Sequence, residues 1–283
     1  MNEITITIPG FSINAKTWGT PDKPPILALH GWLDNANSFT LLAPYLQDDF
    51  YLIAVDLPGH GHSSHLPEGC NYHFIDAVFI ITELLHALKL DKIHLLGHSM
   101  GACLGSLIAG IVPERLLSLY LIEALGPFSA PAETACAQLN SYTHFLTQKH
   151  RKKTRAYDDF AKMALTRSLK GYVSLEIATI LCERGVIKQQ EHFYWRHDPR
   201  LFAPSPLRMT EEQVLSCLKN ISTKTHLLLG NQGFAFDKAI MNKRIKTISD
   251  ITVTRLDGGH HIHMEQPEVV SQLLAAFYQN DTN

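Results

Sequence analysis

Gly97-His98-Ser99-Met100-Gly101 lies between an apolar run, residues 92–96, and a stretch of small residues, 102–112. This order predicts a strand, a sharp turn and a helix. A serine in such a turn has a strained backbone, and glycines on either side let strand and helix approach closely. The strain exposes the hydroxyl oxygen, so Ser99 is the candidate nucleophile.

Short apolar runs typical of buried strands recur along the chain, and helical segments such as 74–88 and 267–278 separate most of them. Residues 1–8 alternate apolar and polar side chains like an edge strand. The alternation predicts an α/β fold, a mostly parallel sheet with helices on both faces, whose site lies at the carboxyl ends of the strands. The strand-like runs are 25–29, 51–55, 93–96, 117–122, 226–229 and 251–256.

The alternation stops between about residues 126 and 219, where the sequence becomes helical, aromatic and basic. We therefore expect a core made of residues 1–125 and 220–283. A helical cap of residues 126–219 is inserted after the sixth core strand. At 283 residues, one large domain carrying an insertion is the natural expectation.

Charge and composition exclude several classes of partner. The net charge of −2 gives no field suited to nucleic acid or an anionic membrane, so we expect a small-molecule substrate. Five scattered cysteines favour neither a disulfide framework nor a zinc site. No phosphate-cradling loop, nucleotide fingerprint or metal-ligand cluster is apparent, so no cofactor and no metal are predicted.

The chain offers no segment that predicts export or membrane insertion. Its first residues lack a basic start followed by a continuous apolar stretch. The most apolar long window, 95–112, contains His98, Ser99 and several glycines, which is untypical of a membrane span. We expect a cytoplasmic protein.

A serine nucleophile needs a histidine to take its proton and an acid to orient that histidine. His260 follows the strand-like run 251–256 and an Asp-Gly-Gly turn, which places it on a loop above the sheet. It is also near the C-terminus, in the chain order serine, acid, histidine. His261 and His263 are rivals, but the position directly after the turn favours His260 as general base.

An oxyanion needs hydrogen-bond donors, and two backbone amides are candidates. His30-Gly31-Trp32 follows the run 25–29, so the amide of Trp32 can point at a developing oxyanion. The amide of Met100, next to the nucleophile, is the second expected donor.

Four motifs in register carry a family resemblance. They are His30-Gly31-Trp32, Asp56-Leu57-Pro58-Gly59-His60-Gly61-His62-Ser63, the Ser99 pentapeptide, and Gly259-His260 with Glu265 and Pro267 downstream. Over nearly its whole length the chain resembles the α/β-hydrolase superfamily, and within it the serine hydrolase-like proteins. The resemblance implies that Asp56 organises its loop and is not a catalyst.

Three carboxylates compete to orient the histidine. The family usually places the acid in a Gly-x-x-Asp turn after the seventh strand, but this chain has Gly230-Asn231-Gln232-Gly233 there. Glu123, at the end of the sixth strand-like run, is favoured because a carboxylate directly after an apolar strand needs a partner. Some haloalkane dehalogenases of this fold take their acid from the same place. Asp237, four residues beyond Gly233, and Asp257 remain alternatives.

The expected reaction is hydrolysis of a carboxylic ester through an acyl-enzyme, on a small or medium apolar substrate. Ser99 stands where dehalogenases and epoxide hydrolases of this fold carry an aspartate, which sets those reactions aside. Hydrolysis of a carbon–carbon bond remains open, since the same residues support it. A non-catalytic binding protein is disfavoured because each required part is present.

The predicted cap suggests how a substrate is recognised. Its aromatic side chains are candidates for an apolar acyl pocket, although most aromatics at helical spacing bury a helix against its neighbours. A basic run, 149–155, is a candidate docking site for an acyl carrier protein bearing a methyl ester or thioester. The candidate pocket residues are Phe128, Tyr142, Phe145, Phe193 and Trp195.

Overall fold

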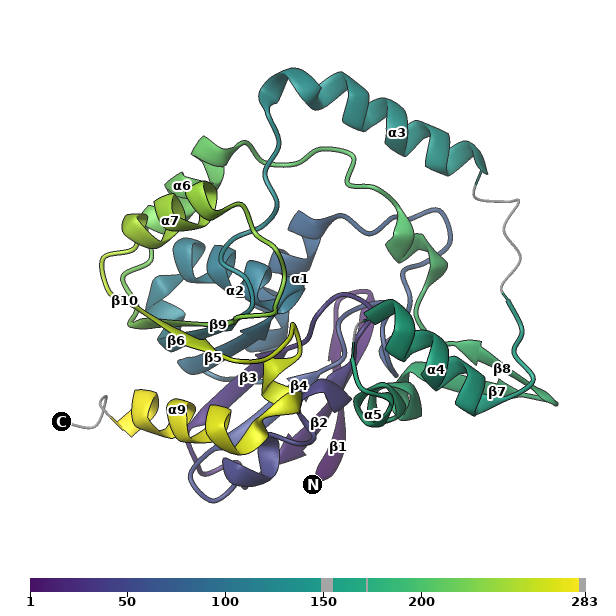
Figure 1. Cartoon of the computed structure of the whole chain (residues 1–283), viewed down its shortest axis with the longest axis horizontal. Helices are drawn as coiled ribbons and strands as arrows, with labels where there is room; N and C mark the ends of the chain where they lie inside the picture. The colour runs from purple at the N-terminus through teal and green to yellow at the C-terminus, as the bar shows by residue number, and fades with distance from the viewer. Residues whose placement is uncertain (149–154, 172, 280–283) are drawn as a thin grey trace.

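A computed structural model of the chain describes residues 1–148, 155–171 and 173–279. An eight-stranded sheet runs through its middle in the order β1-β2-β4-β3-β5-β6-β9-β10 (Figure 1). Along this order, the six strands from β4 to β10 are parallel to one another, and β2 is antiparallel to both β1 and β4. The bounds are β1 Asn2–Ile8, β2 Phe11–Trp18, β3 Pro25–Leu29, β4 Tyr51–Val55, β5 Ile93–His98, β6 Leu116–Ile122, β9 Thr225–Gly230 and β10 Ile251–Leu256.

The sheet confirms the predicted fold class. Each of the six strand-like runs forms a strand, and β1 lies at an edge of the sheet. Strand β2 was not predicted. Its sequence carries Asn14 and Lys16 among apolar residues. The Lys16 ammonium group donates a hydrogen bond to Oδ1 of a distant side chain, Asn37, at 2.7 Å.

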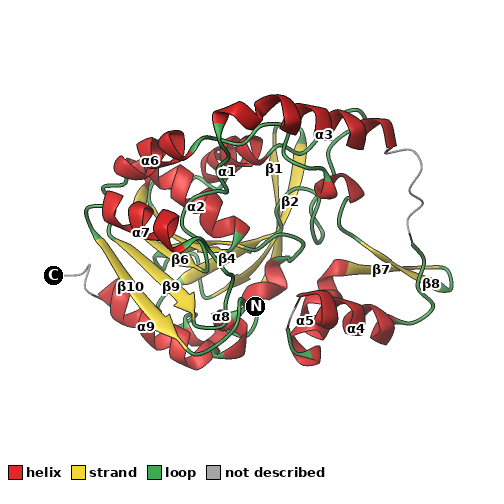
Figure 2. Cartoon of the chain, turned by 45° about the horizontal axis from the view of Figure 1, so that its top comes forward, coloured by secondary structure: helices red, strands yellow, loops and turns green. Residues whose placement is uncertain are grey.

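Helices cover both faces of the sheet (Figure 2). Helices α1, α2, α6 and α7 share one hydrophobic cluster with the sheet, and α8 and α9 share the other. The bounds are α1 Phe74–Ala87, α2 Met100–Ile111, α3 Ala135–Gln148, α4 Phe160–Gly171, α5 Leu175–Gly185, α6 Glu211–Lys219, α7 Lys238–Thr247, α8 Ile262–Glu265 and α9 Pro267–Gln279.

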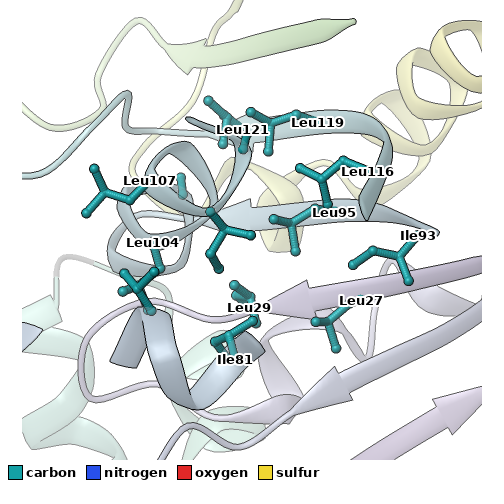
Figure 3. Packing of buried hydrophobic residues seen from close by; sticks show 14 of the residues in the cluster. Leu27, Leu29, Ile81, Ile93, Leu95, Leu104, Leu107, Leu116, Leu119 and Leu121 are labelled. Carbon is teal, nitrogen blue, oxygen red and sulfur yellow. The ribbon is translucent and has the colours of Figure 1, made fainter. Parts of the chain in front are cut away.

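The strands are apolar on both sides because both faces are covered. In β3, Leu27 and Leu29 belong to the cluster under α1 and α2, whereas Ile26 and Ala28 belong to the cluster under α9. Successive side chains of a strand point to opposite faces, which produces this division. Figure 3 shows the α1 and α2 side of the core, where Leu29 and Ile81 lie close together.

The segment between β6 and β9 contains α3 to α6 and a two-stranded hairpin, β7 (Val186–Gln189) with β8 (His192–Trp195). The hairpin is an addition to the predicted helical content, and Gln190 turns it with a φ of 54°. Helices α4 and α5 with the hairpin share a small cluster of their own, whereas Val214 and Leu218 of α6 belong to the main core. The cap boundary at residues 126–219 stays a prediction.

In the described part of the chain, every helix is too short or too polar to cross a membrane.

Candidate active site

The Ser99 turn joins β5 to α2 at the carboxyl edge of the sheet. Ser99 has a φ of 52°, and its N–H donates to the carbonyl oxygen of Ile122 on the neighbouring strand at 2.8 Å. A Cβ at Gly101 would lie 2.1 Å from the carbonyl oxygen of Leu29, and one at Gly97 would lie 2.5 Å from that of Gly101. The glycines therefore allow the close approach of strand and helix on which this turn depends.

His260 lies on the loop after β10, with its ring against Ser99. Its Nε2 is 2.8 Å from Ser99 Oγ, and its Nδ1 is 3.0 Å from Glu123 Oε2. A carboxylate only accepts, so Nδ1 carries the hydrogen and Nε2 accepts from the serine hydroxyl. The structure brings Ser99, His260 and Glu123 together in one hydrogen-bonded series.

Glu123 follows β6 directly, with a φ of 61° and a buried side chain. Its carboxylate also accepts two backbone N–H groups, from Gly230 at 2.5 Å and from Phe234 at 2.8 Å. A Cβ at Gly233 would lie 2.1 Å from Glu123 Oε2, so the missing side chain leaves the space that this carboxylate fills. The Glu123 carboxylate and a side chain at position 233 exclude each other.

The other two candidate acids lie elsewhere. Asp237 is exposed and caps α7, where it accepts hydrogen bonds from the N–H groups of Ala239 and Ile240. Asp257 is also exposed and accepts a hydrogen bond from Asn231. Both therefore have local structural partners.

The rival histidines bind other partners. His261 Nε2 lies 3.1 Å from Asp34 Oδ2, and His263 Nε2 lies 2.9 Å from the hydroxyl oxygen of Ser38. Burial lowers the pKa of His263 well below its usual range. Neither ring makes a hydrogen bond to Ser99 among the described residues.

The two expected oxyanion donors are the amide of Met100, next to Ser99 in the chain, and the amide of Trp32, in the loop after β3. Among the described residues, the backbone N–H groups of Trp32 and Met100 donate to no protein acceptor. The loop is held by Asp34, whose N–H donates to the carbonyl oxygen of Gly31 at 3.1 Å, and Leu33 within it has a φ of 61°. Both amides are thus free to bind a ligand atom.

The predicted pocket aromatics separate into different places. Phe128 is exposed and its ring centroid lies 5.7 Å from that of Phe234, which in turn lies 6.0 Å from the ring of His260. Phe193 and Trp195 pack in the small cluster of α4, α5 and the hairpin.

Tyr142 and Phe145 both belong to α3, away from this cluster. Tyr142 packs against His73, with ring centroids 5.7 Å apart, and burial raises the pKa of its phenol. Phe145 is partly exposed on the same helix. Of the five predicted residues, Phe128 has a ring-to-ring path to His260.

The predicted docking run lies mostly outside the residues that the structure describes: of 149–155, Arg155 alone is described, and it is exposed.

A buried charged cluster underlies the site. The Asp34 carboxylate pairs with the guanidinium of Arg167 on α4 and with His261, and His98 Nδ1 lies 3.5 Å from its Oδ2. Burial opposes ionisation of Asp34, but His261 and Arg167 hold its pKa well below the usual range. Burial lowers the pKa of His98 to about 4.

This cluster has the residue types of a metal site. Asp34, His98 and His261 offer ligand atoms within 4.8 Å of one another. However, Arg167 already neutralises the carboxylate, and a cation there would face the guanidinium. The donor set therefore fits a hydrogen-bonded ion pair better than a metal ion.

Three residues near the site were missed in the sequence. Phe234 gives Glu123 a backbone donor and borders His260, yet its Gly-Phe-Ala-Phe context carries no motif. Asp34 is close enough to His30-Gly31-Trp32 to have been suspected. Its partner Arg167 is 133 positions away, so the pair has no local signal.

Comparison with known proteins agrees with this fold. Residues 24–158 match the family model of the α/β hydrolase fold. The chain belongs to the α/β hydrolase fold family, as its motifs predicted.

Particular relatives refine this assignment. A serine hydrolase-like protein of Dictyostelium discoideum is 32% identical over 97% of this chain and 81% of its own length. A hypothetical protein from Pseudomonas aeruginosa is 34% identical, with a TM-score of 0.93 over 99% of this chain and all of its own. A thioesterase domain from the curacin biosynthetic pathway is 27% identical, with a TM-score of 0.86 over 97% of this chain and 99% of its own. The chain is therefore similar to hydrolases over almost its whole length.

Proposed function

We propose that this protein is a serine-dependent hydrolase of carboxylic esters that works through an acyl-enzyme. The observation that supports it most is the series of hydrogen bonds from Ser99 Oγ through His260 to Glu123, with distances of 2.8 and 3.0 Å. A serine alone is a weak nucleophile, and this series supplies the base and the orienting carboxylate that it needs.

In the first half of the reaction, Ser99 Oγ attacks the ester carbonyl carbon while His260 Nε2 takes the hydroxyl proton. The carbonyl oxygen becomes an oxyanion and accepts hydrogen bonds from the amides of Trp32 and Met100. The intermediate then breaks its bond to the alcohol oxygen, which receives the proton from His260. Glu123 stabilises the imidazolium that exists between these two proton transfers.

In the second half, His260 takes a proton from water, and the resulting hydroxide attacks the acyl carbon on Ser99. The second tetrahedral intermediate expels Ser99 Oγ, which regains a proton from His260. The products are a carboxylic acid and the free enzyme. The exposed ring of Phe234 beside His260, with the exposed ring of Phe128 next to it, favours an apolar acyl or alcohol group.

Labelling with a fluorophosphonate probe tests the nucleophile. We expect the wild-type protein to be labelled and Ser99→Ala to remain unlabelled. A panel of p-nitrophenyl esters then tests the reaction, and we expect turnover of short and medium acyl chains. A folded wild-type protein that neither reacts with the probe nor cleaves any ester contradicts the proposal and favours a non-catalytic binding protein.

A thioester of a carrier-bound acyl chain is a second candidate substrate. Its support is the likeness, at 27% identity, to a protein described as a thioesterase domain. Thioester cleavage uses the same acyl-enzyme, with a thiol in place of the alcohol as leaving group. A comparison of kcat/KM for an oxygen ester and a thioester of the same acyl group distinguishes them. A diketone substrate in the same assay tests carbon–carbon bond hydrolysis.

A further inference from the structure

Asp34 is a buried carboxylate that the proposed reaction does not use. Its Oδ1 accepts a hydrogen bond from Arg167, and its Oδ2 accepts one from His261 Nε2 at 3.1 Å. The same Oδ2 lies 2.8 Å from the place where a Cβ at Gly31 would stand. The carboxylate therefore packs against the backbone at Gly31, within its own loop after β3.

Three neighbours of this carboxylate each adjoin a different part of the candidate site: Gly31, His261, and His98, whose Nδ1 lies 3.5 Å from Asp34 Oδ2. Gly31 precedes Trp32, whose amide is a proposed oxyanion donor. His261 follows His260, the proposed base. His98 precedes Ser99, and its Nε2 donates to the carbonyl oxygen of His260 at 2.8 Å. One carboxylate thus borders the three segments that carry the nucleophile, the base and the oxyanion donor.

We infer that Asp34 is a positioning residue: with Arg167 of α4, it fixes the relative placement of Ser99, His260 and the amide of Trp32. This inference rests on the proposed function. Asp34 does not touch the reacting atoms, so it acts through the segments that do. Its charge is balanced by Arg167, a residue of the inserted region, so helix α4 takes part in aligning the site.

The physical basis is the fixed direction of the hydrogen bonds. A carboxylate accepts on both oxygens, so it can face Arg167 on one side and His261 on the other. In Asp34→Asn, either Arg167 or His261 faces the amide NH₂ group, whichever way the amide is turned. Because that donor loses its acceptor, the segments around Trp32, Ser99 and His260 relax. A misplacement of about 1 Å in a catalytic group can cost on the order of 10²-fold in rate.

A matched ion pair serves as control. Asp56 is also buried and is bound by an arginine of the inserted region, Arg184 of α5, with Nε–oxygen distances of 3.0 and 2.8 Å. Asp56 also accepts N–H groups from Ala36 and His62. It thus resembles Asp34 in burial and partner, but within the described part of the chain its hydrogen bonds reach neither the segment around Ser99 nor that around His260.

The experiment compares Asp34→Asn with Asp56→Asn. Three quantities are measured at one temperature where both proteins are folded: kcat and KM on a p-nitrophenyl ester, and the fluorophosphonate labelling rate. The midpoint of thermal unfolding is measured separately. We expect Asp34→Asn to lower kcat and the labelling rate by about 10- to 100-fold, with KM changed less than about threefold. Asp56→Asn should lower the unfolding midpoint but keep both rates within about threefold of wild type.

The remaining outcomes overturn the inference. It fails if folded Asp34→Asn keeps the wild-type kcat and labelling rate, or if the two variants lose rate equally. If Asp34→Asn does not fold, Arg167→Met against Arg184→Met gives the same comparison, and equal rates in that pair also overturn it. A wild-type protein without labelling or hydrolysis instead refutes the proposed function, and this inference with it.

Discussion

Gly233 leaves the space that the Glu123 carboxylate occupies, so its replacement by alanine tests the site directly. The new Cβ would stand 2.1 Å from Glu123 Oε2, about 1.3 Å inside the 3.4 Å at which ordinary contact begins. The backbone of Gly233 has no positive φ, so alanine meets no conformational penalty of its own. The effect of Gly233→Ala is therefore on the carboxylate.

The size of the effect follows from the geometry. Glu123 Oε2 lies 3.0 Å from His260 Nδ1, and a displacement of the carboxylate by more than about 1 Å removes a hydrogen bond of that length. Loss of the orienting acid lowers kcat by about 10⁴-fold in the serine protease template. Since a displaced carboxylate still stabilises the imidazolium in part, we expect Gly233→Ala to lower kcat by about 10²- to 10⁴-fold.

A double variant makes the prediction more specific. Glu123→Gly removes the carboxylate, and Gly233→Asp supplies one from the strand that the family normally uses. Each single change should lower kcat on a p-nitrophenyl ester by more than about 10²-fold. The double variant should recover to within about tenfold of wild type, because its one carboxylate lies beside His260 Nδ1. The fluorophosphonate labelling rate should follow the same order.

Two results would refute this reasoning. One is a Gly233→Ala variant with the kcat of wild type, which would mean that Glu123 does not orient the histidine or that the loop moves aside freely. The other is a double variant no faster than its single parents. Circular dichroism of all four proteins separates lost alignment from lost folding.

Glu123→Gln should lower kcat by about 10⁴-fold, whereas Asp237→Asn should leave it within about threefold, because asparagine still caps a helix. Steady-state kinetics of the two variants tests this, and the reverse ranking would contradict the assignment of Glu123 as the acid. Gly101→Ala should lower the free energy of unfolding by more than about 3 kcal/mol, because its Cβ would overlap the backbone of β3. A urea titration measures this loss, and an unchanged unfolding midpoint would contradict the prediction. Burial lowers the pKa of His30 to about 4 and that of His60 to about 3, so both stay neutral in the folded protein while the unfolded chain binds protons below pH 6.5. The free energy of unfolding should thus fall as the pH drops from 6.5 toward 4, approaching about 1.4 kcal/mol per pH unit for each histidine. Urea titrations at pH 7, 6 and 5 measure it, and a constant value would count against the two neutral rings.

Much of the fold was predictable because strand signals are local. The runs that became β3 and β4 match in full, since strands buried on both faces are continuously apolar. The run that became β10 also matches in full, although this edge strand is exposed or half-buried throughout and mixes apolar with polar residues. Strand β2 lacked this signal, because Asn14 and Lys16 interrupt it and Lys16 finds its partner, Asn37, only in the folded chain. The β7–β8 hairpin depends on a left-handed residue, Gln190, that is not a typical turn former.

The candidate site divides in the same way. Ser99 and His260 stand in local motifs, so the sequence indicated both. The sequence ranked Glu123 above two other carboxylates but could not show what fills the space at Gly233, since the two positions meet only across neighbouring strands. Asp34 stands close to the His30-Gly31-Trp32 motif, but its buried ion pair with a residue of α4 leaves no pattern in either segment.

The segment between β6 and β9 is attached to the core unevenly, and this has a consequence for its motions. Arg167 of α4 and Arg184 of α5 each form an ion pair with a buried aspartate of the core. Helix α3, by contrast, buries one side chain, Tyr142. Local opening is easiest where few apolar contacts and buried pairs must be lost. Backbone amides of α3 should therefore exchange with deuterium well before those of α5, so this segment opens in parts and not as one unit.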